Sequence, residues 1–216
     1  MPSSTIAILG GTGALGSGLA GRLARAGHHI ILGSRDAARA TEKAESLSEH
    51  GGTIEGSDYR TAAEKCDIAI LTVPFASHAE ILGQVAGALS GKILVDASVP
   101  LVPPKVATVQ LPPQGSAAVA AQALLGEEVT VVSAFQNVGA LHLQHSDEAI
   151  DCDVLVTGNT EAARAQVIAL VEDCGLRGWH AGPLANSTAA EALTSVMIFI
   201  NRFYKTDRAG IRVTGA

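Results

Sequence analysis

Six short runs of apolar residues recur along the chain, and each is apolar at consecutive positions instead of at every second one. Continuous runs of this length are typical of parallel strands that helices bury on both faces. The pattern therefore predicts six buried strands. They cover residues 5–9, 28–35, 67–74, 92–100, 129–135 and 153–158.

Longer Ala-rich stretches follow most of these runs and place their apolar residues on one helical face. Strand and helix alternating in this way predict an α/β fold with a doubly wound, Rossmann-type parallel sheet. The helices are expected at residues 14–26, 36–49, 78–90, 116–125 and 161–174.

The alternation stops after residue 158. A loop rich in Gly and Pro follows the last of these helices and leaves room for one short strand. Thr188 and Glu191 then have the spacing of a capping box, which predicts an apolar helix that runs to about Tyr204. We therefore expect a Rossmann domain over residues 1–158 and a small, mainly helical C-terminal lobe over residues 159–216.

Composition narrows the class of protein. The 216 residues carry a net charge of −6, which argues against a nucleic-acid binder because such proteins need a basic face. No apolar run approaches the roughly 20 residues that span a membrane, and the N-terminal segment lacks the pattern of a signal peptide. Three cysteines without a C-x-x-C pair are typical of a reducing compartment. We expect a cytoplasmic protein that binds neither nucleic acid nor membrane.

The stretch GGTGALG at residues 10–16 carries the strongest chemical signal. Gly11, Gly13 and Gly16 have the G-x-G-x-x-G spacing between a strand and a helix, which is the context of a dinucleotide-binding loop. In this motif Gly11 permits the tight turn and Gly13 lets backbone N–H groups approach a pyrophosphate. Gly16 lets the helix pack closely on the strand.

The end of the second predicted strand indicates which dinucleotide binds. NAD-specific sites usually carry an acidic residue there, whereas this chain has Ser34 and Arg35, with Arg39 one helical turn later. A hydroxyl and two guanidinium groups suit a 2′-phosphate, and Asp36 is placed to cap the following helix. The sequence therefore predicts NADP.

The carboxyl ends of the later strands offer few groups for acid–base catalysis. They are mostly apolar, with Asp96, Ser98, Gln136 and Asn137 as the polar side chains. The Tyr-x-x-x-Lys pair of short-chain dehydrogenases is missing from the sequence. An apolar pocket of this kind suits hydride transfer between two flat rings better than reduction of a carbonyl, which needs a proton donor.

The histidines give weaker signals. His78 is expected either to cap a helix or to line the site, and His180 is expected to be structural. His142 and His145 have no third metal ligand nearby in the sequence, so we interpret them as a solvated helix face and predict no metal site. No histidine is assigned a catalytic role.

Several blocks of this sequence resemble the NADPH-dependent reductases of the deazaflavin coenzyme F420, the F420:NADP oxidoreductases. The blocks occur in the same order across nearly the whole chain. They are IAILGGTGALGSGLAGRLARAGH (6–28), GSRDAARA (33–40), CDIAILTVPF (66–75), VVSAF (131–135), AGPLANSTAAEALT (181–194) and GIRV (210–213). The resemblance implies a homodimeric oxidoreductase that passes hydride between NADPH and F420 as co-substrate.

The resemblance also implies roles for individual residues. One group would contact the pyrophosphate, a second the 2′-phosphate, and a third the path to the nicotinamide ring. The chain departs from the family at one point: Gln136, followed by Asn137, stands where characterised members carry a histidine. The two amides can donate to a deazaflavin carbonyl but cannot act as acids. The three groups are Thr12, Gly13, Ala14 and Leu15; Ser34, Arg35 and Arg39; and Pro74, Phe75, Val138 and Ala140.

Two alternatives stay open from the sequence. The same pocket could serve an NADPH-dependent reductase of a flavin, an imine, a carbonyl compound or a ferric chelate. A module that senses NADP without turnover has a similar glycine loop, although such sensors typically carry a longer partner-binding domain than the segment after residue 158.

Overall fold

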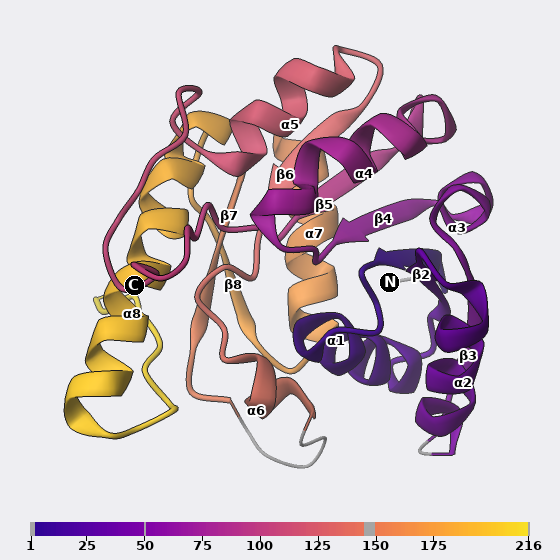
Figure 1. Ribbon diagram of the computed structural model, residues 1–216, viewed down its shortest axis with the longest axis horizontal. Helices are drawn as coiled ribbons and strands as arrows, with labels where there is room; N and C mark the ends of the chain where they lie inside the picture. Colours follow the sequence, from indigo (N-terminus) through magenta and orange to yellow (C-terminus); the bar gives the residue numbers. More distant parts are fainter. Residues whose placement is uncertain (1–2, 50, 145–149, 216) are drawn as a thin grey trace.

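The computed structural model describes residues 3–49, 51–144 and 150–215. Within these ranges one sheet of eight strands runs through the molecule in the order β3-β2-β1-β4-β5-β6-β7-β8 (Figure 1). The strands are β1 (Thr5–Leu9), β2 (His29–Ser34), β3 (Thr53–Asp58), β4 (Ile68–Leu71), β5 (Ile93–Asp96), β6 (Thr130–Ser133), β7 (Asp153–Gly158) and β8 (Arg177–His180). All pairs from β3 to β6 are parallel.

Helices cover both faces of the sheet. One hydrophobic cluster joins the strands to α1, α2 and α7, and a second joins their other face to α3, α4 and α5. The helices are α1 (Ala14–Arg25), α2 (Ala37–Ser48), α3 (Tyr59–Lys65), α4 (His78–Val85), α5 (Ala117–Leu125), α6 (Ala140–Gln144), α7 (Glu161–Asp173) and α8 (Ser187–Tyr204). Short 3-10 turns, η1 (Phe75–Ser77), η2 (Ala86–Leu89) and η3 (Leu184–Asn186), complete the set. None of the described helices is long and apolar enough to cross a membrane.

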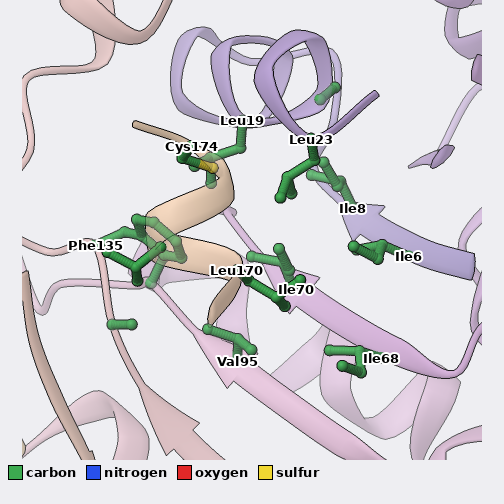
Figure 2. Close-up of a cluster of buried hydrophobic side chains, with 14 of the residues drawn as sticks. Ile6, Ile8, Leu19, Leu23, Ile68, Ile70, Val95, Phe135, Leu170 and Cys174 are labelled. Atoms are coloured by element: carbon green, nitrogen blue, oxygen red, sulfur yellow. The ribbon is translucent and has the colours of Figure 1, made fainter. Parts of the chain in front are cut away.

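Strand β1 shows why the strands are apolar at every position. Ile6 and Ile8 point into the first cluster, where Leu19 and Leu23 of α1 pack over them (Figure 2). Ala7 and Leu9 belong to the second cluster, on the opposite face. Burial of one large aliphatic side chain contributes roughly 1.5–3 kcal/mol, so both faces of each central strand stabilise the fold.

The predicted α/β fold with a doubly wound, largely parallel sheet is confirmed. All six predicted strands are present, several of them shorter at their ends, and the short strand after residue 174 is β8. The prediction missed β3 and α3. Strand β3 is an edge strand with the sequence TIEGSD, and only Ile54 in it is buried, so it lacks an apolar run.

One strand departs from the expected direction. Strand β7 is antiparallel to β6, while β8 is parallel to β7. A strand that begins at the end of the sheet where the preceding strand finished must run in the opposite direction. A parallel strand needs a crossover connection, usually a helix, that carries the chain back to the other end of the strands. Helix α7 provides such a crossover between β7 and β8, whereas the connection from β6 to β7 does not.

The predicted capping box at the start of α8 is wrong. Helix α8 begins at Ser187, and its N-cap residue Asn186 makes no side-chain cap. The Glu191 carboxylate instead accepts hydrogen bonds from the backbone N–H groups of Ala117 and Ala118, at 2.6 and 3.1 Å. Glu191 therefore caps α5, a helix more than 70 residues earlier in the chain.

The guanidinium of Arg22 ties α1 to distant parts of the chain. It is buried and donates to the carbonyl oxygens of His142, Leu143 and Cys174 at 3.2, 3.0 and 2.9 Å. Because these bonds satisfy a buried cation, they fix α6 and the end of α7 against the first helix.

Candidate functional site

The glycine loop between β1 and α1 makes its turn at Gly10. Gly10 has φ +97°, and its N–H and that of Gly11 both donate to the carbonyl oxygen of Gly33, at 3.0 and 3.3 Å. The motif predicts the tight turn at Gly11, but the left-handed conformation belongs to Gly10, one residue earlier. Gly11 is required for another reason: a Cβ there would lie 2.7 Å from Leu32 Cδ2.

Gly16 and Gly13 differ in how closely other atoms surround them. A Cβ on Gly16 would lie 2.7 Å from the carbonyl oxygen of Gly10 and 2.8 Å from Thr72 Oγ1, so only glycine lets α1 approach the loop so closely. Gly13 is exposed, and a Cβ there would meet only the Gly10 carbonyl oxygen, at 3.4 Å. Beside it, the backbone N–H groups of Ala14 and Leu15 have no acceptor among the described residues. These N–H groups form the positive end of α1, a suitable place for a pyrophosphate.

A cleft of about 570 Å³ opens in front of this loop. It lies at the carboxyl ends of β1, β4, β5 and β6, which is where open α/β sheets bind ligands. Its walls are predominantly apolar. The residues are Gly13, Ala14, Leu15, Thr72, Val73, Pro74, Phe75, Ala76, Ala97, Ser98, Val99, Leu101, Pro103, Val106, Phe135, Gln136, Val138, Ala140 and Thr194.

Eight of the expected site residues therefore line a single cleft: Gly13, Ala14, Leu15, Pro74, Phe75, Gln136, Val138 and Ala140. Gly11, Thr12 and Gly16 lie in the loop at its edge, and Ser34, Arg35 and Arg39 lie at the end of β2 and the start of α2. Asn137 is not among the lining residues.

The end of β2 presents two cationic side chains. Arg35 and Arg39 are both exposed, and neither guanidinium pairs with a carboxylate in the described part of the chain. Asp36 caps α2 as predicted, since its Oδ1 accepts from the N–H groups of Ala38 and Arg39 at 3.0 and 3.2 Å. Asp36 is thus committed to the helix, which leaves the arginines available for an anion.

Phe135 holds an unusual backbone conformation at the end of β6. It lies in the left-handed region, with φ +73°, and is almost fully buried. A non-glycine residue in this region stores roughly 1–3 kcal/mol of strain, and such residues cluster at functional sites. The conformation sends the chain after Phe135 across the cleft, so that Gln136 and Val138 become part of its wall.

The amides of Gln136 and Asn137 are engaged within the protein. Gln136 Nε2 donates to the carbonyl oxygen of Asp96 at 2.7 Å and to Ser133 Oγ at 2.9 Å. Asn137 Nδ2 donates to the carbonyl oxygen of Ala190 at 2.8 Å and to Thr194 Oγ1 at 3.3 Å. Both hydrogens of each amino group are therefore used. In this conformation neither amino group has a hydrogen left for a deazaflavin carbonyl.

Helix α8 reaches the cleft through Thr194. Its Oγ1 donates to the carbonyl oxygen of Gln136 at 2.9 Å, which fixes the helix to the loop after β6. One turn earlier, Glu191 is 1% exposed, and burial raises its pKa from 4.5 to about 8, against the backbone N–H groups of Ala117 and Ala118 that lower it. These contacts hold α8 as one wall of the site.

His78 and Asp96 form a buried pair behind the cleft. His78 Nε2 and Asp96 Oδ2 are 2.7 Å apart, and Asp96 Oδ1 accepts from the backbone N–H of Ser98 at 2.9 Å. His78 does not line the cleft, but its ring packs against that of Phe75, with 5.6 Å between the centroids. The pair therefore supports the cleft wall.

The other histidines singled out in the sequence do not line the cleft where the structure describes them. No group of three metal-ligating side chains occurs within residues 3–49, 51–144 and 150–215. His142 Nε2 lies 3.1 Å from the carbonyl oxygen of Asp207, and His145 lies outside the described residues. His180 is exposed on β8, where Arg164 donates to its Nδ1 at 3.4 Å.

Known proteins of similar sequence identify the family of this chain. Residues 5–100 match the family model described as NADP oxidoreductase, coenzyme F420-dependent. The F420-dependent NADP reductase of Methanocaldococcus jannaschii is 41% identical over 219 residues, which cover 97% of each chain. The chain belongs to the F420-dependent NADP reductase family. A second member, from Methanothermobacter marburgensis, is 37% identical with the same coverage.

A solved structure extends the similarity to three dimensions. The crystal structure of a protein from Arthrobacter sp. FB24, described as a candidate F420-dependent NADP reductase, has a TM-score of 0.85 and 26% sequence identity. The match covers 98% of this chain and all of the other. Family membership thus extends over the C-terminal helices as well as the glycine loop.

Some residues of the cleft wall were not among the expected site residues. Leu101, Pro103 and Val106 come from the Pro-rich loop after β5. The proline-rich, apolar composition of this loop is the feature of the sequence that could have indicated a place in the cleft wall. Thr72 and Thr194 were not singled out, although Thr194 is the last residue of a block that carried the resemblance.

Proposed function

We propose that this protein is an oxidoreductase that transfers hydride between NADPH and the deazaflavin coenzyme F420. The observation that carries the proposal is a single apolar cleft that begins at a dinucleotide-binding loop, in a chain 41% identical to an F420-dependent NADP reductase. When bound, the two co-substrates supply the redox chemistry through their rings, and the protein positions them.

The residues present fit NADPH. The N–H groups of Ala14 and Leu15, which have no acceptor among the described residues, would hold the pyrophosphate. Gly13 leaves room for its approach, and Thr12 would contact it. Arg35 and Arg39 would hold the 2′-phosphate, because exposed guanidinium groups bind phosphate oxygens in pairs. Ser34 is a supporting member of this group. Its Oγ accepts from the Asp36 N–H at 3.2 Å, so its hydroxyl hydrogen can still be donated.

The apolar walls would hold the two rings. Pro74 and Phe75 lie on one side of the cleft, and Val138 and Ala140 follow the strained turn at Phe135 on another. Such walls exclude water and bring the two rings together, which is what direct hydride transfer requires. No acid–base side chain lines the cleft among the described residues, in keeping with a transfer that needs no proton relay at the carbon that receives the hydride.

The testing experiment is anaerobic mixing of the purified protein with NADPH and oxidised F420. We expect the deazaflavin absorbance to bleach only when the protein is present, and faster with NADPH than with NADH. If NADPH binds while F420 stays oxidised, the proposal fails. The same assay with a flavin, an imine or a ferric chelate then tests the other reductase reactions, and binding without any turnover would indicate a sensor.

The proposal includes a division of labour along the chain. Residues 1–158 would bind NADP, and residues 159–216 would close the substrate pocket. The position of Thr194 in the cleft wall supports the second part. Thr194→Ala should raise the KM for F420 while leaving the Kd of NADPH unchanged, and an equal loss for both would contradict the division.

The proposal also includes a homodimer. Helix α8 exposes an apolar stripe of Val196, Phe199 and Phe203, which are 41%, 56% and 68% exposed and lie three or four residues apart. Such a stripe is the usual face of a helix that packs against a partner. Phe199→Glu should shift the protein from dimer to monomer in sedimentation experiments, and a wild-type monomer would contradict the assembly.

We place the reductase in the cytoplasm. Cys66, Cys152 and Cys174 are free and buried, and burial raises the pKa of each thiol, to about 12 for Cys174. Thiols of this kind suit a reducing compartment. Fractionation of the cells that make the protein tests the placement.

A further inference from the structure

Three polar side chains of the cleft have committed their hydrogens within the protein. Thr72 Oγ1 donates to the carbonyl oxygen of Leu9 at 3.2 Å, and Thr194 Oγ1 donates to that of Gln136 at 2.9 Å. Both hydrogens of the Gln136 amino group are used as well. None of these groups has a hydrogen left for a ligand.

Ser98 is different. It lines the cleft just after β5, it is only 3% exposed, and its Oγ has no hydrogen-bond partner among the described residues. A buried hydroxyl without a partner destabilises a folded protein, so a protein that keeps one usually has another use for it. Among the side chains of the cleft wall described above, Ser98 carries the uncommitted donor.

The surroundings of Ser98 fix its backbone and leave its side chain free. Its N–H donates to Asp96 Oδ1 at 2.9 Å, and the other oxygen of that carboxylate contacts His78 Nε2 at 2.7 Å. The hydroxyl itself is covered in this conformation, but no acceptor holds it there. Rotation about the single Cα–Cβ bond of a serine exchanges three staggered positions, so an acceptor in the cleft can recruit the hydroxyl.

We propose that Ser98 Oγ donates a hydrogen bond to an amide-type carbonyl oxygen of a ring bound in the cleft, and so selects that ring and its orientation. Two ring systems bring such a carbonyl: the nicotinamide, through its carboxamide, and the deazaflavin, through its pyrimidine portion. The inference rests on the proposed function for the identity of these ligands. It makes Ser98 a specificity-determining residue of the cleft.

A second hydroxyl in the structure provides a matched control. Thr157 on β7 is 1% exposed, and its Oγ1 also has no partner among the described residues, but it does not line the cleft. Removing either hydroxyl should relieve the same kind of burial cost. Only removal of the Ser98 hydroxyl should weaken the binding of a ligand.

The experiment compares Ser98→Ala, Thr157→Val and the wild type. Calorimetric titrations give the Kd of NADPH, of oxidised F420 and of adenosine 2′,5′-bisphosphate, which lacks the nicotinamide. Thermal unfolding without ligand gives the stability. We expect Ser98→Ala to unfold at or above the wild-type temperature and to bind one ring ligand about ten-fold more weakly. Adenosine 2′,5′-bisphosphate should bind all three proteins equally.

The outcomes separate the two ligands and the two proposals. A loss for NADPH alone assigns the carboxamide, and a loss for F420 alone assigns the deazaflavin. Unchanged affinity for both rings overturns the inference, as does a loss of stability in Ser98→Ala that Thr157→Val does not share. If the wild type fails to reduce F420, the proposed function fails, while a weaker NADPH complex of Ser98→Ala still supports the role of Ser98.

Discussion

The two ends of the cleft are built in different ways. The end at the glycine loop is made of backbone: a turn at Gly10, a close approach at Gly16 and the free N–H groups of α1. At the far end, buried polar side chains behind the cleft wall hold α8 in place: Asn137 connects it to the loop after β6, and Glu191 connects it to α5. The first end depends on neighbours in sequence, and the second on contacts between distant segments.

This difference has a physical consequence for substitutions. A site built from backbone tolerates no added atom, since the backbone cannot move aside, whereas a site built from side chains fails when a hydrogen-bonding group is removed. We therefore expect additions to damage the loop end and removals to damage the α8 end.

The largest effect is expected for Gly16→Ala. The new Cβ would lie 2.7 Å from the Gly10 carbonyl oxygen and 2.8 Å from Gly11 Cα, so α1 must move away from the loop. We expect the free energy of unfolding to fall by about 3 kcal/mol and NADPH binding to disappear. Calorimetry and denaturant unfolding measure both.

Gly21→Ala is the matched control, because it makes the same change in the same helix. The nearest atom to its Cβ would be the flexible Arg25 Nη1, at 3.4 Å. This variant should bind NADPH normally and gain a few tenths to 1 kcal/mol of stability. Equal damage in both variants would mean that α1 tolerates no alanine at all and that the loop is not special.

The next effect concerns the choice of dinucleotide. Arg35→Ala with Arg39→Ala should weaken NADPH about 100-fold and NADH less than about three-fold, because only NADPH carries the 2′-phosphate. The Kd values of both dinucleotides check this. Arg25→Ala with Arg60→Ala removes the same charge from other exposed positions. If this control also lowers NADPH affinity 100-fold, the effect comes from net charge and the assignment of the 2′-phosphate site is wrong.

At the far end, Glu191→Ala should leave the N–H groups of Ala117 and Ala118 buried without an acceptor. We expect the free energy of unfolding to fall by about 2 kcal/mol. Glu45→Ala on the exposed face of α2 should change it by less than about 0.5 kcal/mol. Urea unfolding of both variants provides the measurement, and equal stability of the two would show that α8 does not depend on this contact.

Per pH unit, the smallest effect is a pH dependence from the same carboxyl group. Burial raises the pKa of Glu191 from 4.5 to about 8, so the native state holds this proton more tightly than the unfolded state does. Its contribution to stability is complete below pH 4.5 and is lost as the pH rises through about 8. The slope is at most about 1.4 kcal/mol per pH unit.

Glu191→Gln tests this dependence because the amide does not titrate in this range. The free energy of unfolding of the wild type minus that of the variant should decrease steadily from pH 4.5 to pH 8. A constant difference across this range would show that the proton is bound equally in both states. An increasing difference would mean that the backbone N–H groups outweigh burial.

The same contrast decides what the sequence could predict. The loop end follows from a motif of seven residues, and the helix and strands around it from apolar patterns of single segments. The cap by Asp36 was equally local, since the carboxylate binds backbone two and three residues later. Interactions of this range leave a signature in the order of the residues.

The far end left no such signature. Glu191 has the spacing of a local cap but caps α5, because the fold places the first N–H groups of α5 within hydrogen-bonding distance of its carboxylate. The amides of Gln136 and Asn137 looked available for a ligand until the packing of β5 and α8 supplied their acceptors. Edge strand β3 was missed for a related reason, since its pairing with β2, and not its own composition, makes it a strand.

Arg22 has a consequence for the order in which the chain is made. It belongs to the first helix that leaves the ribosome, yet the three carbonyl oxygens that satisfy its guanidinium lie at residues 142, 143 and 174. These three hydrogen bonds can form only after residues 142–174 have been synthesised. The first helix is therefore made early in translation but receives its contacts with α6 and the end of α7 late.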